Sequence, residues 1–177
     1  MMKIEVKEKG SDAFYKEIVN ISAQYRQLIK NHGCKLRDFF TEFKRLLIAG
    51  AVVLGLLILM CVFWGFRTID YVAIGFLSLA VIMCFAYLYL LNRYRKSMID
   101  EAGESILTLD EDGVELSKKD TQVIRNTWNN IAFVRLFNES ICFIPKTRTG
   151  IMICITREFA KQIQDWLKEN KPEIEVI

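Results

Sequence analysis

Two long apolar runs, separated by five residues, constrain this chain more than any other feature. Residues 46–66 (LLIAGAVVLGLLILMCVFWGF) and residues 72–91 (VAIGFLSLAVIMCFAYLYLL) contain no charged residue, no histidine and no proline. A helix rises about 1.5 Å per residue, so roughly 20 residues cross a hydrocarbon core of about 30 Å. We therefore expect two transmembrane helices, with residues 67–71 (RTIDY) as the tight external turn between them.

Two other interpretations of these runs are weaker. A soluble protein of 177 residues has too little remaining chain to enclose both helices on all sides. A cleavable signal peptide lies at the extreme N-terminus, whereas the first run begins at Leu46. We therefore interpret the first run as a retained anchor and the two runs together as an antiparallel hairpin.

Basic residues flank the pair of runs on one side only. The membrane-proximal basic residues are Lys35, Arg37, Lys44, Arg45, Arg93, Arg95 and Lys96. The turn between the runs holds Arg67 and Asp70, whose charges cancel. Because short loops rich in Lys and Arg stay in the cytoplasm, we expect a multi-pass protein of the cell membrane with both termini cytoplasmic. The same basic residues are expected to contact anionic lipid.

The first 45 residues are expected to form an N-terminal cytoplasmic region with a short strand and amphipathic helices. Ile4 and Val6 alternate with charged residues, which is typical of a strand. An apolar stripe at helical spacing follows, at Phe14, Ile18, Ile21, Tyr25 and Leu28. A second stripe at Leu36, Phe39, Phe40 and Phe43 predicts either a helix in the headgroup layer or an extension of the first span. Whether these helices pack on the C-terminal domain or lie on the membrane stays open.

The hydrophobic period changes after a helical linker at residues 92–104. Leu107 and Leu109 alternate with polar residues, DEDG at 110–113 is a strong turn signal, and Val114 and Leu116 alternate again. Further strand-like runs cover residues 121–127, 131–137, 140–144 and 150–155. Short strands joined by short turns predict an antiparallel sheet that curls into a sandwich or small barrel.

The last element has a helical pattern instead. Phe159, Ile163, Trp166 and Leu167 share one face, which should cover the open end of the sheet. We therefore predict a membrane α-helical hairpin plus an α+β cytoplasmic domain. That domain, at residues 105–170, would be a curled antiparallel sheet of about six strands capped by a C-terminal helix, the layout of a pleckstrin-homology-like domain. Residues 171–177 would form a tail.

This order of features resembles the YcxB-like membrane proteins. The similar segments are LDEDGVEL, then WNNIAFVRLF with a Trp-x-x-Ile step, then ITREF, within residues 46–170. Thr156 stands where that family often has proline and Arg157 where it has lysine, while Phe159 keeps the aromatic residue. With Trp166 from the helix face, the expected structural motif is Trp128, Ile131, Arg157, Phe159 and Trp166. The resemblance implies a pleckstrin-like fold and a bacterial inner-membrane location, and it supplies no catalytic residues.

We predict no catalytic, cofactor-binding or metal site. Transport and intramembrane catalysis need ionisable groups within the spans, and these spans have none. The acidic groups at Asp100–Glu101 and at residues 110–112 fall in a polar linker and a turn, which favours solvated charge. His32 is the sole histidine and lies near Cys34 at a helix break, which we interpret as coincidence. The five cysteines form no CxxC pair, and a cytoplasmic location would keep them reduced.

Charge separates the candidate functions. Residues 1–45 carry a net charge of +4, whereas residues 93–177 carry thirteen Lys and Arg against fourteen Asp and Glu, net −1. A domain that recruits anionic lipid or nucleic acid is expected to be basic, and the pairs Lys118–Lys119 and Lys146 with Arg148 are small.

The leading hypothesis is therefore a membrane-anchored, non-catalytic protein-interaction or regulatory module. Its expected partners are membrane lipid and an unidentified protein or a second copy, with no nucleic acid. Alternatives are an immunity-type protein that protects the membrane from a toxin, a membrane-surface lipid sensor, and a subunit that positions a catalytic partner.

The predicted topology is testable by cysteine accessibility. A cysteine introduced at Thr68 should react with a membrane-impermeant reagent in intact cells, because the turn would lie outside. A cysteine at Ser117 should react only after the cells are opened. Labelling at Ser117 rather than Thr68 in intact cells would reverse the orientation.

Overall fold

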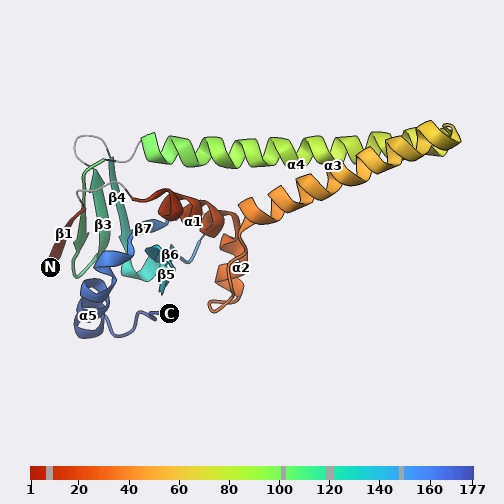
Figure 1. Cartoon of the computed structure of the whole chain (residues 1–177). Helices are drawn as coiled ribbons and strands as arrows, with labels where there is room; N and C mark the ends of the chain where they lie inside the picture. The colour runs from red at the N-terminus through yellow and green to blue at the C-terminus, as the bar shows by residue number, and fades with distance from the viewer. Residues whose placement is uncertain (7–9, 101–102, 119–121, 148–149) are drawn as a thin grey trace. The chain divides into compact units, whose positions relative to one another are not determined.

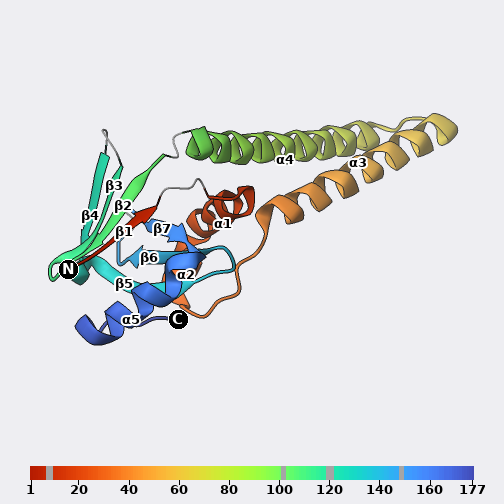
Figure 2. The same ribbon diagram turned by 60° about the vertical axis from the view of Figure 1, so that its left-hand side comes forward.

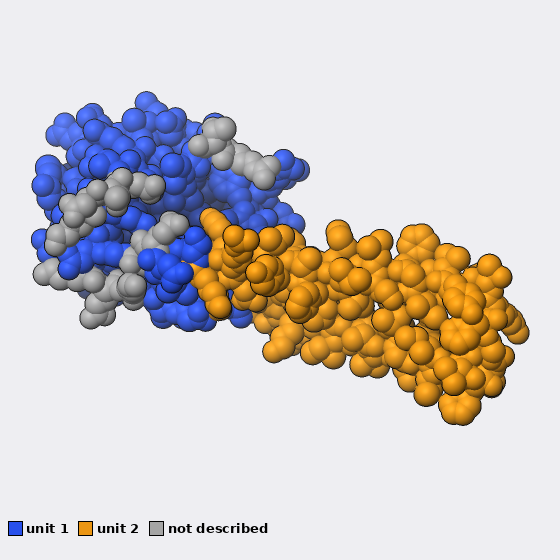
Figure 3. All heavy atoms as spheres, turned by 90° about the horizontal axis from the view of Figure 1, so that it is seen from above, with its two compact units in different colours: residues 1–36, 97–177 blue, residues 37–96 orange. Residues whose placement is uncertain are grey.

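The computed structural model divides the chain into two compact units (Figure 3). Unit 1 contains residues 1–36 and 97–177, and unit 2 contains residues 37–96. The structure describes residues 1–6, 10–100, 103–118, 122–147 and 150–177. Three of the charged residues named above, Glu101, Lys119 and Arg148, lie outside the described residues.

Unit 2 is a hairpin of helices α3 (Phe39–Trp64) and α4 (Thr68–Asp100) (Figure 1). Gly65 ends α3 with φ of +83°, a left-handed conformation that glycine adopts without a Cβ penalty. The Asp70 carboxylate accepts a hydrogen bond from the Arg67 backbone N–H at 2.8 Å and so caps the start of α4. The break is therefore residues 65–67, and the predicted turn at 67–71 is wrong by about three residues. Phe39 and Phe43 begin α3 itself, so the second apolar stripe is an extension of the first apolar run.

The two hairpin helices touch at a few points. The Phe43 and Tyr87 rings lie 4.6 Å apart, and a Cβ built on Gly50 would lie 3.0 Å from Val81. Their most apolar stretches are otherwise exposed, with 6% of the stretch buried in α3 and none in α4. Both helices are long and apolar enough to cross a membrane, and they are not the enclosed core of a globular domain.

The described residues of unit 1 form seven strands in two antiparallel sheets (Figure 2). The first sheet has the order β1 (Met2–Val6), β2 (Ser105–Leu109), β3 (Gly113–Lys118), β4 (Gln122–Thr127). The predicted turn after β2 is confirmed, because the Asp110 carboxylate accepts from the N–H groups of Asp112 and Gly113 at 2.9 and 2.8 Å. Short polar turns of this kind join consecutive antiparallel strands.

Strand β1 pairs directly with β2, with Met2 opposite Leu109 and Val6 opposite Ser105. The predicted division into an N-terminal region at 1–45 and a separate domain at 105–170 is therefore wrong. The N-terminal strand belongs to the domain because its apolar side chains are buried there. Ile4 and Val6 are only 5% and 9% exposed, since β1 completes the sheet and places them in the core. The domain is discontinuous, with the hairpin inserted between its first two strands.

The second sheet has the order β5 (Ile131–Leu136), β6 (Ser140–Pro145), β7 (Ile153–Thr156). Among the described residues the two sheets share no ladder, so they form two layers rather than one closed sheet. Short 3₁₀ segments at Trp128–Asn130 and Arg157–Phe159 precede β5 and helix α5. Residues 174–177 are not a free tail, because Val176 forms a parallel bridge with Val134 of β5.

Helix α5 (Ala160–Asn170) covers the core between the sheets, as predicted. Ile163 and Leu167 are its buried centre, at 0% and 1% exposure. Trp166 is only partly buried and stacks on Trp128 with 5.8 Å between ring centroids. The helix therefore docks through its aliphatic residues, with the tryptophan pair beside them.

Helices α1 (Asp12–Ala23) and α2 (Tyr25–Lys30) cover the other face of the second sheet. Ile21 and Leu28 are fully buried in a cluster with Phe133, Cys142 and Ile144. The N-terminal helices therefore pack on the β-sheet domain, which decides the alternative that the sequence left open.

We expect Leu28→Ala to destabilise unit 1 by about 2–5 kcal/mol, the usual cost of emptying a buried leucine site. The full chain in detergent micelles should then be cleaved faster by protease within unit 1, because a typical free energy of unfolding is only about 5–15 kcal/mol. Arg26→Ala, an exposed position on the same helix, is the control. Equal cleavage of the two variants would show that α2 contributes little to the fold.

Candidate functional site

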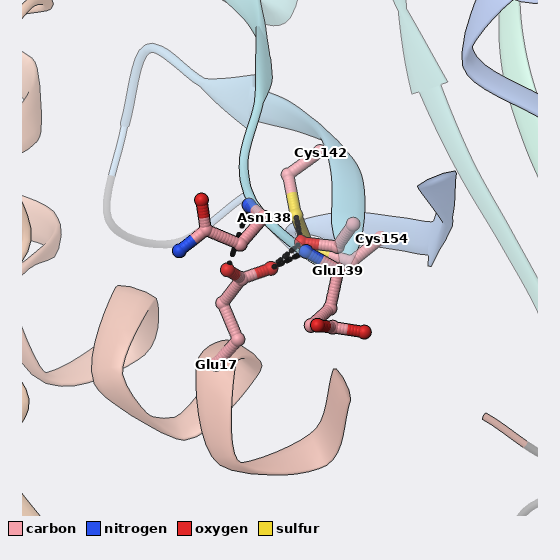
Figure 4. Close-up of a disulfide and its surroundings, with 6 residues drawn as sticks. Glu17, Asn138, Glu139, Cys142 and Cys154 are labelled. Carbon is pink, nitrogen blue, oxygen red and sulfur yellow. Dashed lines mark hydrogen bonds between the residues drawn. A yellow bond between two sulfur atoms is a disulfide. The ribbon is translucent and has the colours of Figure 1, made fainter. Parts of the chain in front are cut away.

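A carboxylate on α1 joins this helix to the turn between β5 and β6. Glu17 accepts hydrogen bonds from the backbone N–H groups of Asn138 and Glu139 at 2.9 and 3.1 Å, and from the Ser140 hydroxyl at 2.7 Å (Figure 4). Hydrogen bonds to an ionised acceptor are stronger than neutral ones. The Glu17 clamp therefore fixes α1 on the sheet at one defined point.

Beside this clamp, Cys142 of β6 and Cys154 of β7 form a disulfide (Figure 4). The two residues lie directly opposite each other in the β6–β7 register. Cys142 is fully buried, and Cys154 packs against Phe14, Tyr15 and Ile18 of α1. The expectation that all five cysteines are reduced is therefore wrong for this pair, because strand register rather than sequence spacing brings the sulfurs together. Cys34, Cys61 and Cys84 are free thiols.

Helix α1 has a second neighbour on its apolar side. Met98 and Ile99, from the last turn of α4 that belongs to unit 1, pack against the same cluster of Phe14, Tyr15 and Ile18. Burial raises the pKa of the Tyr15 hydroxyl above its ordinary value, and a backbone hydrogen bond with Gly10 lowers it in part. The disulfide and the end of α4 therefore pack against the same apolar residues of α1.

A shallow pocket lies between the start of α1, the β5–β6 turn and the 3₁₀ segment at Arg157–Phe159. Its polar groups are paired with each other. The Arg157 guanidinium donates to the Asn138 carbonyl at 3.3 Å, and the Thr156 hydroxyl donates to the Glu158 carboxylate at 2.8 Å. Glu139 also lines the pocket, so its charge is mixed and selects no class of ligand.

The residues of the predicted structural motif lie around the core of unit 1. Trp128 is buried and its indole N–H donates to the Asp110 carbonyl at 2.9 Å, which ties the β4–β5 connection to the β2–β3 turn. Ile131 is buried in the core, whereas Phe159 and Trp166 pack against its edge. The structure brings Trp128 and Trp166 together and leaves Arg157 exposed at the pocket. The arrangement is structural.

The membrane-proximal basic residues gather at the ends of the hairpin helices. Lys44 and Arg45 are exposed just before the first apolar run, and Arg93 and Lys96 are exposed after the second. The Arg95 guanidinium lies 6.0 Å from the Phe40 ring centroid, a cation–π contact between the two helices. Lys35 and Arg37 are exposed in the segment before α3.

His32 and Cys34 contribute to the packing of the α2–α3 connection. The Arg135 guanidinium donates to the carbonyls of His32 and Cys34 at 2.5 and 2.8 Å. The His32 ring lies 4.2 Å from the Phe133 ring centroid. Tyr25 donates its hydroxyl to the Pro145 carbonyl at 2.5 Å, and burial raises the pKa of this hydroxyl. These contacts hold the N-terminal segment on the second sheet, and sequence spacing gave no signal for them.

Among the described residues, no group of three or more His, Cys, Asp or Glu is placed to hold a metal ion. Comparisons of the chain with protein-family models, with curated proteins and with solved structures find no match. The resemblance to the YcxB-like proteins therefore stays a proposal.

The Glu17 clamp predicts how the disulfide responds to reductant. Without its carboxylate, α1 should open more often, because hydrogen bonds to a charged group contribute about 1.5–3 kcal/mol. In Glu17→Ala the Cys142–Cys154 bond should therefore be reduced roughly tenfold to a hundredfold faster under native conditions. Maleimide labelling followed by mass measurement would count the released thiols.

Glu139→Gln is the matched control, because Glu139 contributes only its backbone N–H to the clamp. Equal reduction rates for Glu17→Ala and the unchanged chain would show that α1 does not shield the bond. Five reactive thiols in the denatured, unreduced chain would show that the disulfide does not form.

Proposed function

We propose that this chain is a membrane-anchored, non-catalytic protein-interaction or regulatory module, and that unit 1 is a pleckstrin-like domain presented on the cytoplasmic face. The packing of Cys142 and Cys154 under α1 would shield their disulfide from the reductants of that compartment. The observation that carries this proposal is the insertion of the hairpin between β1 and β2. Strand β1 and helices α1 and α2 enter the domain before the hairpin, and strands β2 to β7 enter it afterwards. The domain is therefore tethered to the anchor at two points of its chain.

The helix lengths support a position at the membrane surface. Helix α3 begins seven residues before the first apolar run, and α4 continues nine residues beyond the second. At about 1.5 Å per residue these extensions reach roughly 10 and 13 Å beyond the hydrocarbon core. That distance is roughly twice the thickness of one headgroup layer, which is about 5–7 Å. A permanently anchored domain at this height needs no lipid affinity of its own for recruitment.

The charge distribution favours a protein partner for unit 1. Unit 1 holds seventeen Lys and Arg against eighteen Asp and Glu, net −1, whereas unit 2 holds seven against three, net +4. Six of those seven basic residues flank the apolar runs on the side away from the turn. Contact with anionic lipid therefore belongs to the base of the hairpin, and the nearly neutral domain remains for protein contacts.

The layout of unit 1 supports the pleckstrin-like assignment. A four-stranded and a three-stranded antiparallel sheet enclose a core that the C-terminal helix α5 covers. The hairpin is inserted between the first two strands, so this chain differs from a simple order of anchor followed by domain. We propose that both ends of the domain are cytoplasmic.

Vesicle binding separates this proposal from a lipid sensor. We expect unit 1, made by joining residues 1–36 to 97–177, to sediment weakly or not at all with anionic vesicles at physiological salt. A peptide of residues 34–45 should sediment measurably, and less as salt rises, because each basic residue contributes about 1 kcal/mol near an anionic surface. Strong, phosphoinositide-selective binding by unit 1 would replace the protein-partner proposal with a lipid sensor.

A further inference from the structure

The outer edge of β5 is covered by residues 174–177 of the same chain. The Val134 N–H donates to the Glu175 carbonyl at 2.9 Å, and the Ile177 N–H donates to the Val134 carbonyl at 2.9 Å. The Leu136 N–H donates to the Ile177 carbonyl at 2.8 Å. This segment, which we name the closing strand, runs parallel to β5. It occupies the edge in the way that a bound peptide adds a strand to a sheet.

The side chains of the closing strand alternate between the two faces of the sheet. Ile174 and Val176 pack against the core between the sheets, while Ile177 packs on the opposite side with the cluster around Phe133. The Glu175 carboxylate lies 3.3 Å from His32 Nδ1. All four residues are partly buried or exposed, so none is enclosed as a core residue is. The pattern describes what this edge accepts: an extended segment with branched apolar residues and an acidic residue between them.

The other sheet edges have features that oppose strand addition. Strand β1 carries Lys3 and Glu5, and β7 is only four residues long. Strand β4 carries Arg125, which pairs with carboxylates of the β2–β3 turn. Charged side chains and a short length commonly prevent an edge strand from pairing with another chain. Strand β5 has six residues, and its one charged side chain, Arg135, is directed to backbone carbonyls of the α2–α3 connection.

We propose that the β5 edge is a peptide-binding site, and that the closing strand occupies this edge until a segment of a partner protein displaces it. The ligand is an extended segment with branched apolar residues spaced as in Ile174, Val176 and Ile177. This inference rests on the proposed function and names the surface by which the module binds a protein. A short, partly buried occupant with three backbone hydrogen bonds to β5 is suited to exchange.

The test uses the full chain in detergent micelles and a fluorescent peptide with the sequence of residues 171–177, KPEIEVI. One variant lacks residues 173–177, and a second carries Val176→Ser with Ile177→Ser. An attached strand competes at an effective concentration on the order of millimolar. Peptide affinity should therefore rise roughly 100-fold in the deletion variant, less in the serine variant, and be weakest in the unchanged chain. A peptide with serine at all three apolar positions is the control.

Equal peptide binding to all three proteins, or none to folded variants, would overturn the proposal. Unfolding of both variants, seen as loss of near-ultraviolet circular dichroism, would also overturn it, because the closing strand would then be a fixed part of the domain. If the unchanged chain forms dimers and the peptide dissociates them, the ligand of the β5 edge would be the closing strand of a second copy. Chemical cross-linking of the full chain in membranes tests the proposed function separately. A protein partner bound elsewhere on unit 1 would be cross-linked even if the peptide does not bind.

Discussion

The ladder between β1 and β2 is the contact on which the domain depends. It joins residues 2–6 to residues 105–109, with the whole hairpin between them. Closing a flexible loop of about 100 residues would cost roughly 4 kcal/mol of chain entropy. The hairpin shortens the effective loop, because the Arg95 guanidinium lies 6.0 Å from the Phe40 ring centroid and joins the two ends of the hairpin. The order of the chain therefore places the whole hairpin between two paired strands of the first sheet.

The second sheet is the central layer of unit 1. Strand β6 is buried at all six positions, because one face meets the core under α5 and the other meets α1 and α2. A strand covered on both faces is apolar without alternation, and SICFIP has that character. The Cys142–Cys154 bond and the Glu17 clamp lie at the interface between this layer and α1. The N-terminal helices are thus part of the folded domain and cannot be removed from it without exposing that face.

Local patterns in the sequence predicted the elements better than their partners. Continuous apolar runs indicated the hairpin helices, and the Asp110–Gly113 turn and the face of Ile163 and Leu167 were read correctly, because each depends on neighbours a few residues away. The pairing of β1 could not be predicted, since Ile4 and Val6 indicate a strand but not the strand they join. Glu17 and the two cysteines depend on strand register, which no spacing reveals. Gly65 and Asp70 mark the exact hairpin break, but the apolar run continues past Gly65 to Phe66 and hides it from a count of apolar residues.

The insertion of the hairpin also orders the events of synthesis. Strand β1 leaves the ribosome first, but its partner β2 follows about 100 residues later, after both apolar helices. At roughly 5–20 residues per second, β1 waits on the order of 5–20 s without a sheet to join. The domain can close only on a chain whose hairpin has already been made. Completion of the first sheet therefore marks a chain in which the whole hairpin has already been synthesised.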